Sequence, residues 1–228
     1  MNNLLVKKVL HIIFPILTPF VIMMTAIRLL LTPYFPQFEY NLPGFPEDKY
    51  GFSKQERLFF SEKSIDYLIN QEDISFLKNL KMADGIQLFN DRELRHMVDV
   101  KNLVQAALLV WRIVSIGVLL IIILLVIKNQ QPIIRSSLFL SGLSTLGLIL
   151  LILAMVLINF YELFNYFHYL FFTGDTWLFF ESDTLIRLFP LKFWQDAFIL
   201  VGLFTVMVGF ILIIFFPPKE TMINKKNQ

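Results

Sequence analysis

The chain has 228 residues, of which 56% are hydrophobic and 17% charged, and its mean hydropathy is +0.64. This is far more apolar than an ordinary soluble domain, so the composition predicts an integral membrane protein. The absence of cysteine excludes disulfide frameworks and thiolate chemistry, and a net charge of +2 without a clustered basic face argues against a nucleic-acid partner.

Four apolar runs are long enough to cross the roughly 30 Å hydrocarbon core of a bilayer as helices. They are residues 9–31, 103–127, 136–160 and 195–216. The first run follows Lys7 and Lys8, but it is too long for a secretory signal and no small-residue cleavage site follows it, so we interpret it as a retained anchor. Pro15 and Pro19 should kink it, which a membrane helix tolerates where neighbours bond the freed carbonyls.

The charges that flank these runs predict the orientation of the chain. One side carries a single acidic residue, Glu220, against seven basic residues: Lys7, Lys8, Lys128, Arg135, Lys219, Lys225 and Lys226. By the positive-inside rule this side, with both termini, is cytoplasmic, and the connections 32–102 and 161–194 lie outside. We therefore expect an all-α plasma-membrane protein with five segments: 1–31, the N-terminus and first span; 32–102, an extracytoplasmic segment; 103–160, a hairpin of spans two and three; 161–194, an interfacial loop; and 195–228, the fourth span and tail.

Two capping signals predict helices in the first outer segment. Ser53 and Glu56 form an S-x-x-E capping box, followed by an apolar stripe. Asn90 and Glu93 mark a second start, and nothing breaks the chain after it, so one helix should run from about Asp91 through the second span. The segment 32–102 is too small to bury a generous core alone, and we expect it to pack on the spans or the bilayer surface.

The segment 161–194 is unusually aromatic, as residues at a water–lipid interface often are. We expect it to lie along the outer leaflet, with a turn at Thr173-Gly174-Asp175.

His96 and His168 are the only histidines on the outer side. On the predicted helix Asp99 at i+3 and Arg92 at i−4 share a face with His96, so the Asp99 carboxylate can accept the Nδ1 hydrogen and leave Nε2 as a base. The alternatives are a solvated, charged helix collar for His96 and an ordinary interfacial histidine for His168. Their position at the adjacent outer ends of one helical hairpin favours a shared function.

The sequence gives only weak signals for other catalytic or binding sites. Arg112 lies inside the second span, where a charge is a functional candidate by default. The motifs of serine hydrolases, zinc metalloproteases and nucleotide-binding loops are absent, and two histidines make a weak zinc site. We therefore expect acid–base chemistry without a metal or cofactor.

Two blocks of sequence carry a family resemblance. LFNDRELRHMVDVKNLV (88–104) and FHYLFFTGDTWLFFESDTLIRLFPLKFWQD (167–196) resemble the signature blocks of the lipoprotein intramolecular transacylase (Lit) family of Firmicutes. The chain departs from the expected pattern at 180–182, where Phe-Glu-Ser stands in place of an Asp-Pro-like turn.

The resemblance implies a four-span enzyme that moves the sn-2 acyl chain of a diacylglyceryl lipoprotein to the α-amine of its N-terminal cysteine, leaving a lyso-form lipoprotein. It implies that His96 and His168 are the functional pair; we add Asp99, Arg92, Asp175, Trp177 and Arg112 as supporting or substrate-binding candidates. Ester-to-amide transfer is downhill and an amine with a pKa of roughly 8 needs only a histidine-strength base, so no cofactor is required.

One histidine, with His96 preferred, is expected to deprotonate the amine. The other, with Trp177 or backbone amides near Gly174, is expected to polarise the ester or protonate the departing oxygen. The alternatives are a membrane acyl hydrolase or intermolecular acyltransferase with the same pair, or a non-enzymatic docking subunit.

Overall fold

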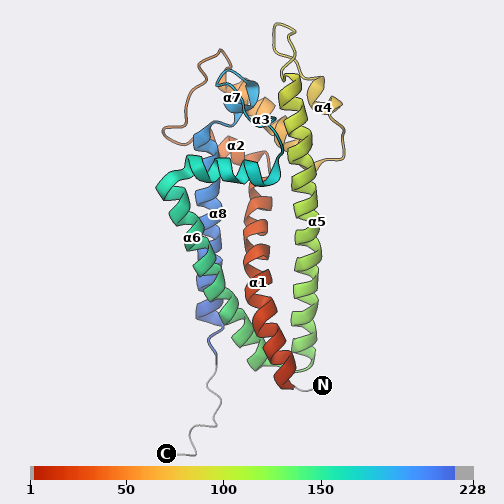
Figure 1. Cartoon of the computed structure of the whole chain (residues 1–228), viewed down its shortest axis with the longest axis vertical. Helices are drawn as coiled ribbons and strands as arrows, with labels where there is room; N and C mark the ends of the chain where they lie inside the picture. Colours follow the sequence, from red (N-terminus) through yellow and green to blue (C-terminus); the bar gives the residue numbers. More distant parts are fainter. Residues whose placement is uncertain (1–2, 219–228) are drawn as a thin grey trace, which may run out of the picture. The chain divides into compact units, whose positions relative to one another are not determined.

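The computed structural model describes residues 3–218, and within this range the chain is helical, with one isolated antiparallel bridge between Lys81 and Gln87 (Figure 1). The helices are α1 (Asn3–Leu30), α2 (Tyr34–Glu39), α3 (Lys54–Ile69), α4 (Ser75–Lys78), α5 (Asp91–Ile127), α6 (Gln131–Phe171), α7 (Thr184–Leu188) and α8 (Leu191–Phe215). This confirms the predicted all-α class.

Four helices are long and apolar enough to cross a membrane, as the sequence predicts. They are Lys7–Leu30, Asp91–Ile127, Gln131–Phe171 and Leu191–Phe215. The second and third extend well beyond the apolar runs 103–127 and 136–160, because the helical backbone continues into the flanking connecting segments. Four of the charges used to predict the orientation, Lys219, Glu220, Lys225 and Lys226, lie outside the described residues.

The described chain forms two compact units. The first comprises residues 3–26, 110–153 and 201–218, and the second comprises residues 27–109 and 154–200. In the first unit a small apolar core joins α1, α5 and α6 through Leu10, Phe14, Leu125, Ile133, Ile134 and Leu138.

The two prolines of α1 leave the helix unbroken. Because Pro19 has no N–H, the carbonyl of Pro15, four residues earlier, has no donor within the helix. The Ser144 hydroxyl on α6 donates to that carbonyl at 2.8 Å. A neighbouring helix thus bonds one freed carbonyl, as expected for proline inside a membrane.

Glycines allow α6 and α8 to approach closely in the first unit. A Cβ added at Gly142 would lie 2.8 Å from the backbone oxygen of Gly209, and one added at Gly202 would lie 2.4 Å from Leu153. Small residues at such contacts are the usual device for packing helices in lipid, where no hydrophobic driving force joins them.

The second unit has a larger core, to which both connecting segments, 32–102 and 161–194, contribute. Tyr67, Leu77 and Phe89 of the first segment pack in one cluster with Leu188 and Phe193 of the second. Polar contacts reinforce this core: the Thr184 hydroxyl donates to the Leu88 carbonyl at 2.6 Å. The core also includes Val104, Ala197 and Leu200 of two predicted spans, so residues 32–102 pack both on spans and on residues 184–193.

Both predicted capping signals form. Ser53 and Glu56 make a reciprocal capping box at the start of α3. At the start of α5 the Asn90 side chain accepts from the Glu93 amide at 3.0 Å, while the Glu93 carboxylate accepts from the Asn90 amide at 2.8 Å. The continuous helix from Asp91 through the second span is therefore confirmed.

The predicted interfacial loop begins as helix rather than as irregular chain. α6 continues to Phe171 after a kink at Asn159, whose φ of −158° and ψ of 85° are not helical. The ribbon turns sharply there, so the last turns of α6 run at a steep angle to the turn before the kink (Figure 1). This kink sets the direction of the helical turns that carry His168.

Candidate active site

His96 and His168 meet in the second unit. His96 lies on the second turn of α5 and His168 on the last turn of α6. Their ring centroids are 6.1 Å apart with an angle of 24° between the ring planes, and each residue is only 8% exposed. The pairing predicted from the helical hairpin is present in the structure.

The orientation of His168 is fixed by its own helix. Its Nδ1 lies 2.7 Å from the carbonyl oxygen of Phe164. Because a carbonyl only accepts, Nδ1 carries a hydrogen, and in the neutral ring Nε2 then keeps a free lone pair. The Phe164 and Trp177 rings, with centroids 4.2 Å and 4.8 Å away, hold the imidazole in this position.

Aromatic edges surround His96. The planes of the Phe172 and Phe179 rings are inclined to it by 64° and 66°, with 5.1 Å and 5.3 Å between centroids. Its buried Nδ1 has no hydrogen-bond partner among residues 3–218. The bond expected from Asp99 is therefore absent: Asp99 is exposed, since a residue at i+3 is displaced around the helix and here points to solvent.

Arg92 forms an ion pair with a residue that is distant in the sequence. Its guanidinium donates to the Asp183 carboxylate at 2.6 Å and lies over the Phe179 and Phe180 rings, 5.4 Å and 5.2 Å from their centroids. Asp183 also accepts from the Asn90 side chain at 3.1 Å. The pair thus holds the segment after Trp177 against the start of α5.

Sequence reasoning missed Asp183. Besides Arg92 and Asn90, it accepts a hydrogen bond of 2.8 Å from the Phe180 amide and so closes the 180–183 turn. This is the place where the chain departs from the expected Asp-Pro-like turn. The D-T-L-I motif contained the signal, because an aspartate before a short helix commonly forms such local bonds.

The buried Glu93 connects the start of α5 to the start of α7. It is 1% exposed, and beyond its bond to Asn90 it accepts from the Leu185 amide at the start of α7 at 2.7 Å. The sequence identified Glu93 only as a cap, but the structure gives its second oxygen a long-range role.

The segment 173–178 forms a turn that places Trp177 next to His168. Gly174 has a positive φ of 70°, which glycine adopts without strain, and the Leu178 amide donates to the Asp175 carbonyl at 3.1 Å. The Asp175 side chain is exposed, whereas Trp177 is 7% exposed. Within the described chain, the buried indole N–H of Trp177 and the Thr176 hydroxyl have no hydrogen-bond partner.

Arg112 belongs to the first unit, where its side chain is exposed, and its role stays a prediction. No group of three or more His, Asp or Glu residues within 3–218 is arranged to hold a metal ion.

The comparisons with known proteins identify the family. The model of the lipoprotein intramolecular transacylase Lit family matches residues 12–194, which is most of the chain. The chain belongs to this family. A relative from Aquifex aeolicus (strain VF5), described as an uncharacterized protein, is 30% identical over 210 residues, covering 92% of this chain and 93% of its own.

The Lit fold is also found by structural comparison. The membrane integral lipoprotein intramolecular transacylase Lit from Bacillus cereus superposes with a TM-score of 0.72 at 19% identity, covering 97% of both chains. A structure of that protein with one histidine replaced by arginine gives a TM-score of 0.69, again at 19% identity, over 97% of this chain and 93% of that one. The chain is thus a multi-pass membrane protein with the Lit fold, and its family is a family of transacylases.

Proposed function

We propose that this protein moves the sn-2 acyl chain of a diacylglyceryl lipoprotein to the α-amine of the N-terminal cysteine, with His96 and His168 as the catalytic pair. The observation that carries the proposal is the stacked pair itself, 6.1 Å apart in an enclosed aromatic site. The membership of the Lit family supports the substrate and the outcome.

The hydrogen bond from His168 to the Phe164 carbonyl supports His168 as the base, reversing the preference for His96. His168 Nε2 accepts a proton from the α-ammonium, and the neutral nitrogen attacks the ester carbonyl. The C–N bond forms, the C–O bond to glycerol breaks, and the second N–H proton reaches the glyceryl oxygen through His96. An ammonium substrate therefore releases one proton per turnover.

Trp177 is suited to stabilise the charge on the ester oxygen. Its indole N–H is a buried donor without a partner in residues 3–218, next to His168. A donor aimed at developing negative charge typically lowers a barrier by about 3 kcal/mol. Amine and ester belong to one molecule, so the aromatic enclosure contributes mainly by holding them in attack geometry.

The proposed orientation places both termini in the cytoplasm and the histidine pair at the outer face of a bacterial plasma membrane. Because the chain has no cysteine, single cysteines report cleanly on orientation. A membrane-impermeant maleimide applied to intact cells should label Thr173→Cys and leave Gln131→Cys unlabelled. The reverse pattern contradicts the orientation.

The function is tested with purified protein and a synthetic diacylglyceryl lipopeptide. Tandem mass spectrometry should find an unchanged total mass with one acyl chain on the α-amine. His96→Gln and His168→Gln should lower the rate by about 100-fold or more, the usual contribution of general acid–base groups. His11→Gln, which changes a histidine of the first unit, is the matched control.

Loss of one acyl mass would identify a hydrolase, and an acyl chain on a second molecule would identify an intermolecular acyltransferase. Full activity of both folded histidine variants would refute the pair, and no reaction in folded protein would favour a docking subunit.

A further inference from the structure

Buried polar groups are nearly always hydrogen-bonded in folded proteins, so a cluster of unpartnered ones calls for a bound molecule. In the part of the second unit that the structure describes, such atoms belong to Glu39, Arg92, His96, Thr176 and Trp177. Their positions separate them into two groups.

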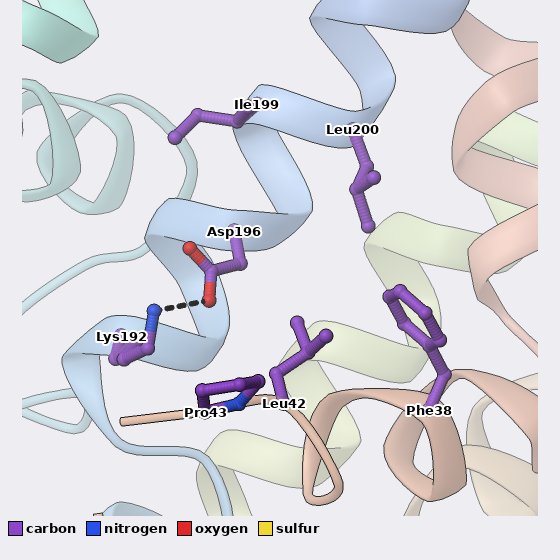
Figure 2. A pocket seen from close by; sticks show the side chains of 7 residues that line it. All are labelled: Phe38, Leu42, Pro43, Lys192, Asp196, Ile199 and Leu200. Atoms are coloured by element: carbon purple, nitrogen blue, oxygen red, sulfur yellow. Dashed lines mark hydrogen bonds and ion pairs between the residues drawn. The ribbon is translucent and has the colours of Figure 1, made fainter. Parts of the chain in front are cut away.

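Glu39 is accounted for within the protein. Its carboxyl faces the Asp196 carboxyl, where a shared proton satisfies both groups. Asp196 in turn accepts from Lys192 Nζ at 2.7 Å. These two charges line a pocket of about 250 Å³ between α8 and residues 38–43, and Figure 2 shows the bond between them. The charged side chains of this pocket therefore already satisfy each other.

The other four unpartnered atoms gather at the histidine pair. One is Nδ1 of His96 itself. Trp177 Nε1 and Thr176 Oγ1 come from the turn beside His168. The fourth atom is Nε of Arg92, which lies one turn before His96 on the same face of α5. The proposed reaction uses His96 and Trp177 but gives Arg92 Nε no partner.

The ion pair of Arg92 leaves this nitrogen free. Arg187, in the same unit, binds Asp48 through both Nε and Nη2, at 2.9 Å and 3.0 Å. Arg92 instead donates to Asp183 through Nη2, and the other oxygen of that carboxylate accepts from Asn90. Arg92 Nε–H is thus a buried donor on a guanidinium whose charge is already balanced.

A shared aromatic wall joins this donor to the reaction site. The Phe179 ring centroid lies 5.3 Å from that of His96 and 5.4 Å from Cζ of Arg92. Four residues of a helix rise by about 6 Å, so the two side chains are one turn apart along this wall. A substrate group that extends from His96 toward the start of α5 therefore meets Arg92.

We propose that Arg92 Nε donates to the sn-1 ester carbonyl of the substrate, so that the site recognises a glyceryl head with two esters. This inference rests on the proposed function, in which His96 serves the sn-2 glyceryl oxygen. The sn-1 ester is attached to the neighbouring glycerol carbon, whereas the cysteine carbonyl is next to the amine at His168. The thioether sulfur on the other neighbouring carbon is only a weak acceptor.

The charge balance at Arg92 also favours a carbonyl. Because Asp183 neutralises the guanidinium, the free Nε–H offers one hydrogen bond without net charge, which suits a neutral ester better than a phosphate. The sn-1 ester keeps its charge during the transfer, so this bond stabilises the bound substrate and the transition state equally. Such binding lowers KM and leaves kcat unchanged. Arg92 is therefore a specificity-determining residue.

The probes are two synthetic lipopeptides that differ only at sn-1, where one has an ester and the other an ether without a carbonyl. With the parent protein we expect an about tenfold higher KM for the ether at a similar kcat, because a charged donor loses its acceptor. Arg92→Lys keeps a cation for Asp183 but has no Nε–H, so it should bring the two KM values together. Arg95→Lys, an exposed change on the same helix, should keep the difference.

Each comparison is made between two substrates within one variant, so an overall loss of rate or stability cancels. Equal KM values in the parent protein, or an unchanged ratio in folded Arg92→Lys, overturn the inference while leaving the transacylase proposal intact. The first of these results needs no variant. If the parent protein transfers an acyl chain in neither lipopeptide, the proposed function fails and this inference fails with it.

Discussion

The Arg92 guanidinium and the Asp183 carboxylate form an ion pair of 2.6 Å across 91 residues of sequence. One partner lies on the first turn of α5, one turn before His96. Asp183 lies at the end of the segment that places Trp177 beside His168. The pair therefore fixes the distance between the two halves of the proposed active site.

Replacing Asp183 should slow catalysis because it displaces the segment that holds Trp177. It does not remove a group that takes part in the reaction. Asp183→Ala removes acceptors for Arg92, Asn90 and the Phe180 amide, so the segment that holds Trp177 loosens. We expect acyl transfer to slow by about 10- to 100-fold, because misplacing reacting groups by about 1 Å can cost up to 100-fold in rate. Glu181→Ala, an exposed change in the same turn, is the control for initial rates on the lipopeptide. A wild-type rate for folded Asp183→Ala would show that the pair only stabilises the fold.

Glu39 should make stability fall as pH rises. Burial, with the neighbouring Asp196 carboxyl, raises the pKa of Glu39 to about 8, from 4.5 in a free side chain. The folded state thus holds this proton more tightly than the unfolded state, so the contribution is most favourable below about pH 4.5 and is lost as pH rises through 8. Glu39→Gln should exceed the parent melting temperature by a small margin at pH 5.5 and by a larger margin at pH 8.5.

The exposed Glu47→Gln serves as the control for that comparison. If Glu39→Gln and the parent lose stability equally between pH 5.5 and 8.5, the Glu39 carboxyl is not the group that titrates.

Ser144 and Pro19 should be coupled energetically. The Ser144 hydroxyl bonds the carbonyl that Pro19 frees, so Ser144→Ala should destabilise the protein by about 1 kcal/mol. In a Pro19→Ala background the new N–H restores the bond within α1, and the same serine change should then cost little. A double-mutant cycle on unfolding free energies measures the difference, and additive effects would contradict the coupling.

Gly142 should tolerate no side chain, whereas Gly147 on the same helix should. A Cβ at Gly142 meets the Gly209 backbone oxygen at 2.8 Å, but one at Gly147 meets nothing within 4 Å. We expect Gly142→Ala to cost about 1–3 kcal/mol through overpacking. Gly147→Ala should gain roughly 0.5 kcal/mol or more from backbone entropy. Thermal unfolding in one detergent compares them, and equal midpoints would rule out the close approach.

The sequence was informative wherever the signal is local. The apolar runs predict four spans, and Asn90 with Glu93 predicts where α5 begins, because capping and hydrophobic length act within a few residues. His96 and His168 are far apart in the sequence, but they could be paired because the short connection between spans two and three makes these helices antiparallel neighbours.

Long-range partners could not be predicted. Arg92 has acidic neighbours on its own helix, and only the tertiary structure brings Asp183 to it. The helical spacing of Asp99 and His96 was correct, but spacing does not fix the direction of a side chain, and Asp99 faces solvent. The pocket at Asp196 depends on α2 and α8, which are far apart in the chain.

The partner of His168 Nδ1 is a main-chain atom, and this has a consequence for how the site can vary. A carbonyl cannot be removed by a point substitution, so any residue at position 164 supplies the same acceptor. The tautomer of His168 is therefore insensitive to ordinary mutation. Inserting or deleting one residue before His168 would still leave a carbonyl four residues earlier in the helix, but it would rotate the ring by about 100° around the helix axis and so separate it from its partners in the site. A substitution at position 164 would thus keep the acceptor of the hydrogen bond while removing the Phe164 ring that packs on the histidine.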